Sequence, residues 1–164
     1  MKILKILIIS TLSFLFVSAQ IPSCGKLSLV SATVQKTIPG HRDANIKEEY
    51  IFICKKPKSS NMTITNLWKG NAKKGRFIDY KIMKLDDGKI INEEINTLLG
   101  VKTFAIVARY KYPVDLANNP VKKSNDLCPI DNFEGKTIIE YSKKSKAKHL
   151  KVFEIEKLET IKKR

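Results

Sequence analysis

The chain has few of the side chains that carry out most enzyme chemistry. Only two of its 164 residues are histidine, His41 and His149, although histidine is the commonest general acid or base near neutral pH. It contains no GxSxG nucleophile elbow, no HExxH zinc motif and no phosphate-binding glycine loop. We therefore predict a non-catalytic protein without a cofactor. An enzyme of an unrecognised class is the alternative.

Metal ligands are equally scarce. His41 and Asp43 form at most half of a metal site, and Asp86-Asp87-Gly88 lacks the alternating acids of a calcium loop. We therefore predict no bound metal. We interpret Asp86-Asp87-Gly88 as a three-residue hairpin loop with its glycine in the left-handed conformation.

Acidic residues and arginines are both in short supply. The chain has 31 lysines and arginines against 16 aspartates and glutamates, a net charge of +15. Only Arg42, Arg76, Arg109 and Arg164 are arginines, and arginine is the residue favoured for bidentate phosphate contacts. We therefore expect no nucleic-acid partner, whereas the charge permits an anionic surface ligand. The alternative is a solvated lysine-rich surface that binds nothing.

Long apolar runs are absent after the N-terminus. Residues 6–17 are almost entirely apolar, follow two lysines and lead into Val17-Ser18-Ala19, whose small residues suit signal peptidase. This run is too short to span a bilayer, which takes ~20 residues. We predict a helical signal peptide over residues 1–19, cleaved after Ala19, and a secreted or periplasmic protein with no membrane span. Lipidation of Cys24, just beyond that site, is the alternative.

The mature chain has the size of one domain. Removing 19 of the 164 residues leaves 145, enough to bury a core. The removed segment carries two lysines and no acidic residue, so the net charge falls from +15 to +13. No internal repeat or long linker divides the remainder. We therefore predict a single domain over residues 20–164.

Alternating apolar and polar residues indicate a β-rich fold. Glu49–Cys54 is the densest run of β-branched, aromatic and cysteine residues, and turn signals flank it at Pro39-Gly40 and Pro57–Asn61. We predict that this run is a central strand buried on both faces. The other predicted strands, the first with a bulge near Val30, are Lys26–Gln35, Met62–Lys69, Arg76–Leu85, Lys89–Ile91, Val101–Tyr110, Lys136–Ser142 and Lys148–Ile155.

One short helix is predicted over Glu93–Leu99. Asn92 is a good N-cap, the two glutamates suit the positive end of a helix, and Gly100 suits a left-handed residue after its end. Seven or eight short strands with regularly spaced turns and this one helix predict an all-β fold. The expected architecture is an antiparallel two-sheet sandwich, immunoglobulin-like in form.

Three cysteines remain after cleavage, and an odd number in an oxidising compartment predicts one disulfide and one free thiol. A bridge between Cys54 and Cys128 would pin the long Pro113–Gly135 loop. A bridge between Cys24 and Cys54 would suit a hairpin that turns at Pro39-Gly40. The third pairing stays open.

The order Cys54, Trp68, Cys128 resembles the Cys…Trp…Cys spacing of immunoglobulin domains. The resemblance covers only these three residues. That family has a strand before its second cysteine, with a tyrosine two residues earlier, whereas this chain has Asp126 in a loop and Pro129 after the cysteine. The resemblance therefore implies a sandwich architecture and not membership of the family.

Basic residues gather in the predicted turns. The predicted contacts for an anionic ligand are Lys73, Lys74, Arg76, Lys143, Lys144 and Lys146, with similar clusters at 55–58 and 122–123. Turns of a sandwich lie at its two ends, so several clusters would combine into one positive rim. We expect a module that contacts a protein or an anionic surface ligand through loops and basic turns. A small inhibitor or effector acting through Pro113–Gly135 is the alternative.

Overall fold

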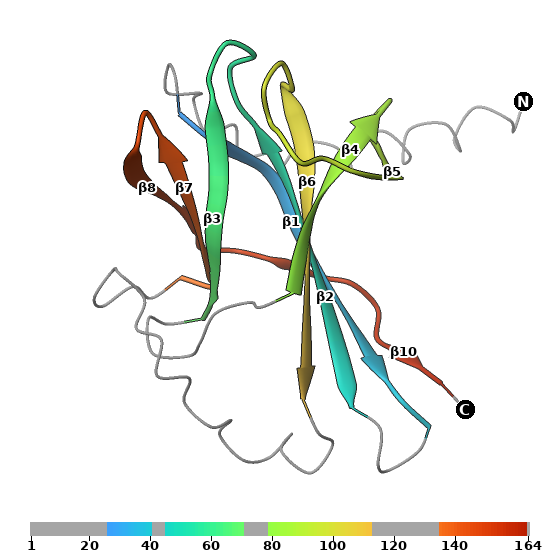
Figure 1. The fold of residues 1–164 in the computed structure, drawn as a ribbon. Helices are drawn as coiled ribbons and strands as arrows, with labels where there is room; N and C mark the ends of the chain where they lie inside the picture. Colours follow the sequence, from blue (N-terminus) through green and yellow to red (C-terminus); the bar gives the residue numbers. More distant parts are fainter. Residues whose placement is uncertain (1–25, 41–44, 71–78, 113–134, 164) are drawn as a thin grey trace, which may run out of the picture.

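The computed structural model describes residues 26–40, 45–70, 79–112 and 135–163. These residues form two β-sheets, and none of them is helical (Figure 1). The strands are β1 (Ser28–Ile38), β2 (Ile46–Lys55), β3 (Met62–Lys69), β4 (Asp79–Asp86), β5 (Lys89–Glu94), β6 (Thr103–Tyr112), β7 (Thr137–Lys143), β8 (Lys146–Val152), β9 (Glu156–Lys157) and β10 (Ile161–Lys162).

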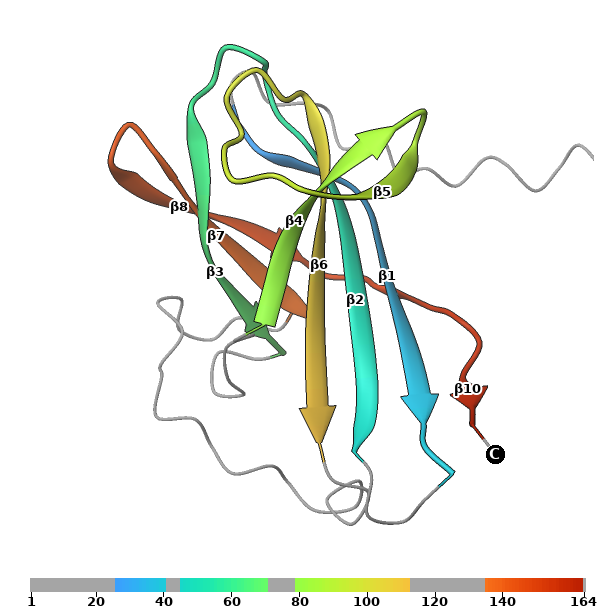
Figure 2. The same ribbon diagram turned by 45° about the vertical axis from the view of Figure 1, so that its right-hand side comes forward.

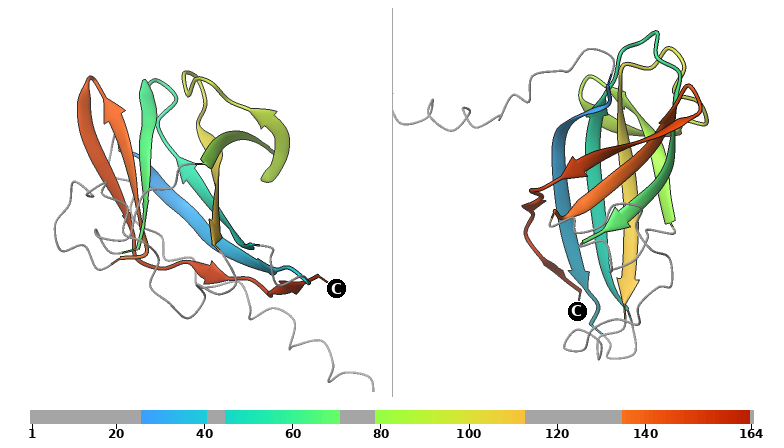
Figure 3. Two further views of the ribbon diagram at one scale, coloured as in Figure 1. Left: turned by 60° about the horizontal axis from the view of Figure 1, so that its bottom comes forward. Right: turned by 90° about the vertical axis from the view of Figure 1, so that its left-hand side faces the viewer.

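The larger sheet has the strand order β10-β1-β2-β6-β4-β5, with β9 also paired to β1, and the smaller sheet has the order β3-β7-β8. Strand pairs are antiparallel, except that β9 and β10 run parallel to β1. Figures 2 and 3 show the sheets as separate layers of an open sandwich. The predicted all-β, two-sheet architecture is confirmed.

The core lies between the facing sides of the two sheets. Along β2 the inward residues Tyr50, Phe52 and Cys54 alternate with outward ones, because successive strand side chains point to opposite faces. The largest fully buried side chain of β6 is Phe104, which like Phe52 is 0% exposed. Burying such a side chain contributes about 1.5–3 kcal/mol. The smaller sheet contributes Met62, Ile64, Leu67, Ile139, Tyr141 and Val152.

The turns and the bulge follow the sequence closely. The register of β1 on β2 shifts between Leu29 and Ser31, which confirms the bulge predicted near Val30. Gly88 has the predicted left-handed conformation, at φ 75°, but Asp87 shares it, at φ 46°. Because Asp86 pairs with Lys89, the loop has two residues and not three. Two successive positive φ values are typical of a type I′ turn, which matches the twist of a hairpin.

The predicted helix over Glu93–Leu99 is wrong. Glu93 and Glu94 belong to β5, where they pair with Lys84 and Lys81 of the neighbouring strand at 3.1 and 2.8 Å. The backbone N–H of Ile95 donates to a carbonyl of β4, so the β pairing continues where a helix would begin. The glutamates that suit a helix start therefore serve as cross-strand partners here.

Cys54 does not form either of its predicted bridges. The structure holds it as a free thiol that is 0% exposed, because β2 directs it into the core between the sheets. Cys24 and Cys128 lie outside the described residues, so a bridge between those two remains a prediction. Trp68, the middle residue of the immunoglobulin comparison, is buried, at 7% exposed.

The prediction that Glu49–Cys54 is buried on both faces is also wrong. Its inward residues are buried, but Glu49, Ile51 and Ile53 on the other face are only partly buried. No described part of the smaller sheet covers this face, because that sheet packs on the opposite side. Among the described residues, this side of β2 is therefore half-buried and not part of the core.

Candidate functional site

The predicted ligand contacts divide between described and undescribed residues. Lys143, Lys144 and Lys146 form the tip of the β7–β8 hairpin. The other predicted cluster, Lys73 to Arg76, lies outside the described residues, as does nearly all of the Pro113–Gly135 loop. The candidate site is therefore built from the β7–β8 hairpin and what lies beside it.

The β7–β8 turn lies next to the β2–β3 turn at one end of the sandwich (Figure 1). Together they line a cleft of about 720 Å³, which we call the end cleft. Two of its lining residues are lysines, five carry hydroxyl groups, one is an amide, one is proline, and none is acidic. They are Pro57, Ser59, Ser60, Asn61, Thr63, Ser142, Lys143, Lys144 and Ser145.

A buried lysine shapes the β2–β3 side of the end cleft. Lys56 is 2% exposed, and its ammonium group donates to the carbonyl oxygens of Pro57 and Ser60 at 3.2 and 2.7 Å. Burial lowers the pKa of Lys56. These two hydrogen bonds connect both ends of the 57–60 segment to one ammonium group and so stabilise the β2–β3 turn. The hydroxyl oxygen of Ser60 is buried and has no hydrogen-bond partner in the described structure.

A tight turn presents the lysines of the β7–β8 hairpin. Lys143 pairs with Lys146, and the two residues between them have positive φ values, 52° at Lys144 and 59° at Ser145. A type I′ turn normally has asparagine or glycine at these positions. Three lysines are thereby concentrated on one hairpin tip. The segments 55–63 and 142–146 contain no acidic residue, so the potential at the end cleft is positive.

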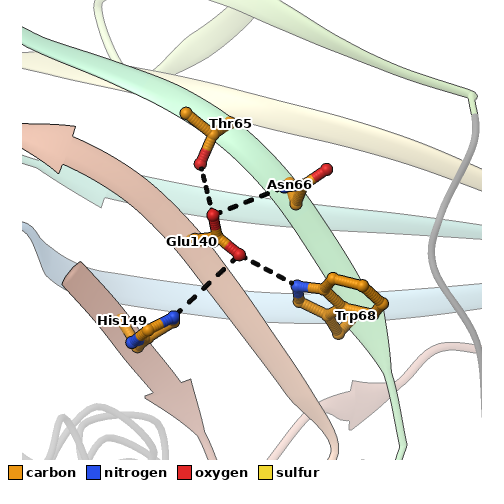
Figure 4. A network of polar contacts seen from close by, with 5 residues as sticks. All are labelled: Thr65, Asn66, Trp68, Glu140 and His149. Carbon is orange, nitrogen blue, oxygen red and sulfur yellow. Dashed lines mark hydrogen bonds and ion pairs between the residues drawn. The ribbon is translucent and has the colours of Figure 1, made fainter. Parts of the chain in front are cut away.

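A second polar cluster lies on the smaller sheet, around Glu140 of β7 (Figure 4). Its carboxylate accepts hydrogen bonds from Thr65 Oγ1 at 3.1 Å, Asn66 Nδ2 at 3.4 Å and Trp68 Nε1 at 3.3 Å. His149 Nε2 lies 3.9 Å from it, beyond hydrogen-bond distance. Three donors from β3 contact the carboxylate, so this cluster ties β3 to β7.

A third cluster joins the two sheets. Lys69 of β3 donates to the carboxylate of Glu48 on β2 at 2.5 Å, and the Tyr50 hydroxyl donates to the same oxygen at 2.7 Å. The ammonium group also lies 4.0 Å from the ring centre of Tyr110. Burial, and the nearby Glu48 carboxylate, raise the pKa of Tyr110. The Glu48 carboxylate and the Tyr110 ring both stabilise the positive charge of Lys69, and the Lys69–Glu48 pair links the two sheets.

Neither cluster provides the ligands of a metal site. Across the described ranges, no three histidine, cysteine or acidic side chains gather in a group that would hold a metal ion. Burial raises the pKa of the Cys54 thiol to about 12, so it is not a thiolate nucleophile near neutral pH. In the same ranges, no helix is long and apolar enough to cross a membrane.

Sequence reasoning identified the lysines of the end cleft but missed its other half. The hydroxyl-rich wall comes from 57–63, about 80 residues earlier in the chain than Lys143. Nothing local in the sequence pairs these two turns. Comparisons of the chain with family models, with curated proteins and with solved structures found no match.

Proposed function

We propose that this protein is a secreted, non-catalytic binding module that contacts an anionic ligand through the end cleft. The observation that supports the proposal most directly is the composition of the cleft, which holds two lysines and five hydroxyl side chains and no carboxylate. Ammonium groups attract sulfate, phosphate or carboxylate groups, and hydroxyl groups donate hydrogen bonds to their oxygens.

The electrostatics of the end cleft favour weak, salt-dependent binding. Each exposed lysine–anion contact contributes about 0.2–1 kcal/mol, because water and ions screen it. Several such contacts on a polyanion such as a sulfated glycan add up, while a single small anion gains only one or two. A repeating anionic surface is therefore a better ligand than an isolated ion.

The test compares two double variants that remove the same charge. Lys143→Gln with Lys144→Gln neutralises the end cleft, and Lys162→Gln with Lys163→Gln neutralises the C-terminal strand, which lies at the other end of the molecule (Figure 1). On a heparin column the cleft variant should elute at clearly lower salt than the unmodified protein. The C-terminal variant should elute close to it.

Two results would contradict the proposal. If both variants elute at equally reduced salt concentrations, retention depends on net charge and not on the end cleft. Elution of the unmodified protein at the salt concentration of a neutral control protein would exclude anionic-ligand binding altogether.

A further inference from the structure

A buried lysine lies behind one wall of the end cleft. Lys56 is only 2% exposed, although lysine is almost never fully buried unless it is paired. Its ammonium group donates to the carbonyl oxygens of Pro57 and Ser60, and both of these residues line the end cleft. The positive charge of Lys56 therefore lies directly behind the surface that a ligand would meet.

The charge of Lys56 is only partly compensated. An ammonium group has three N–H donors, and the described residues provide two acceptors for it, both neutral carbonyl groups, and no carboxylate. Buried charges are normally paired, because removing an ion from water is costly. An anionic group bound in the end cleft would supply the missing partner.

The segments beside Lys56 offer no anion of their own. Residues 55–63, 95–103 and 142–146 contain no acidic side chain. Their other charged residues are Lys55, Lys58, Lys102, Lys143, Lys144 and Lys146. The hydroxyl group of Ser60, buried and without a hydrogen-bond partner in the described structure, can rotate its O–H bond toward an anion. Two polar groups that lack full compensation thus occur together, and both favour negative charge in the end cleft.

We infer that Lys56 is a positioning residue of the end cleft, which fixes the 57–60 wall and attracts an anionic group of the ligand from behind it. This inference rests on the proposed function. It assigns affinity to a side chain that the ligand does not touch, whereas attraction by surface charge alone would assign it to exposed lysines. A buried charge is screened less by water and salt than an exposed one, so its effect at short range is larger.

Ligand binding should be coupled to the protonation of Lys56. Without a ligand, burial lowers the pKa of Lys56 below its ordinary value of 10.5. A nearby anion favours the charged form and raises that pKa again. Affinity should therefore fall as pH rises through the pKa of the unliganded lysine, and binding in that range should take up protons.

Isothermal titration calorimetry with a heparin-derived hexasaccharide compares two variants that each lose one charge. Lys56→Gln removes the buried charge but keeps an N–H donor for the turn. Lys102→Gln removes an exposed charge at a residue that does not line the end cleft, although its carbonyl oxygen accepts a hydrogen bond from the backbone of Lys56 at 2.8 Å. The dissociation constant should rise about 10-fold in Lys56→Gln and less than about 2-fold in Lys102→Gln.

The pH profile separates an electrostatic role of Lys56 from a purely structural one. Between about pH 7 and about pH 9.5, the affinity of the unmodified protein should fall more steeply than that of Lys56→Gln. An NMR titration of the Lys56 side chain in the unmodified protein measures the same coupling without any variant. Its pKa should be higher with bound hexasaccharide than without, by more than that of Lys102.

Three results would overturn the inference: a folded Lys56→Gln variant that binds like Lys102→Gln, a loss of affinity with an unchanged pH profile, or a Lys56 pKa that the ligand does not raise. Far-UV circular dichroism checks that each variant is folded. In all three cases, weaker binding by Lys143→Gln with Lys144→Gln would show that the proposed function holds without Lys56. If that double variant also binds like the unmodified protein, both proposals fail.

Discussion

Replacement of Glu48 by glutamine should destabilise the fold by about 2 kcal/mol. The change removes the anion that compensates Lys69 but keeps an oxygen for the Tyr50 hydroxyl. Breaking a fully buried ion pair costs about 3–5 kcal/mol, whereas an exposed pair contributes about 0–1 kcal/mol. The side chains of Glu48 and Lys69 are 18% and 25% exposed, so the cost falls between these limits.

A double-mutant cycle isolates the pair. Lys69→Met keeps the length of the side chain and removes the ammonium group that contacts Glu48, at a cost similar to that of Glu48→Gln. The two changes together should cost about 1–2 kcal/mol less than the sum of the single variants, since the interaction is lost only once. Urea unfolding measures each free energy. The single variants should also lower the melting temperature by about 4–8 °C.

A matched surface pair supplies the control. Glu93 pairs with Lys84 at 3.1 Å, and their side chains are 59% and 50% exposed. Glu93→Gln makes the same chemical change where water screens it, and should cost less than about 0.5 kcal/mol. Equal effects of Glu48→Gln and Glu93→Gln, or strict additivity in the cycle, would refute the view that Lys69 ties the sheets together.

Two further predictions concern buried groups. Glu140→Ala removes the carboxylate that accepts hydrogen bonds from Thr65, Asn66 and Trp68, and should cost about 2–3 kcal/mol in urea unfolding. A loss under about 0.5 kcal/mol would mean that water replaces the carboxylate. The second prediction is a pH dependence that comes from Cys54. Burial raises the pKa of its thiol from an ordinary 9.0 to about 12. The contribution of the protonated thiol to stability is therefore complete below pH 9.0 and is lost as pH rises toward 12. Urea unfolding should show about 2–3 kcal/mol more loss between pH 8 and pH 11 in the unmodified protein than in Cys54→Val. Parallel losses would place the thiol in contact with water.

The strands were predictable because their signal is local. Alternation with a period of two identifies β2, β3 and β6 without any knowledge of their neighbours, and β3 begins and ends as predicted, at Met62 and Lys69. The helix prediction failed for the complementary reason. The glutamates at 93 and 94 satisfy a helix start equally well, and only the non-local pairing of β5 with β4 makes them part of a strand.

The candidate site was less predictable, because it depends on which turns meet. The lysines at 143, 144 and 146 were identified from their turn, yet the hydroxyl-rich wall of the end cleft comes from the β2–β3 connection. No local sequence pattern pointed to Glu140, because the residues that donate hydrogen bonds to it lie 72–75 residues earlier in the chain. The Cys54 bridges failed because spacing along a chain does not tell which sheet face a thiol occupies.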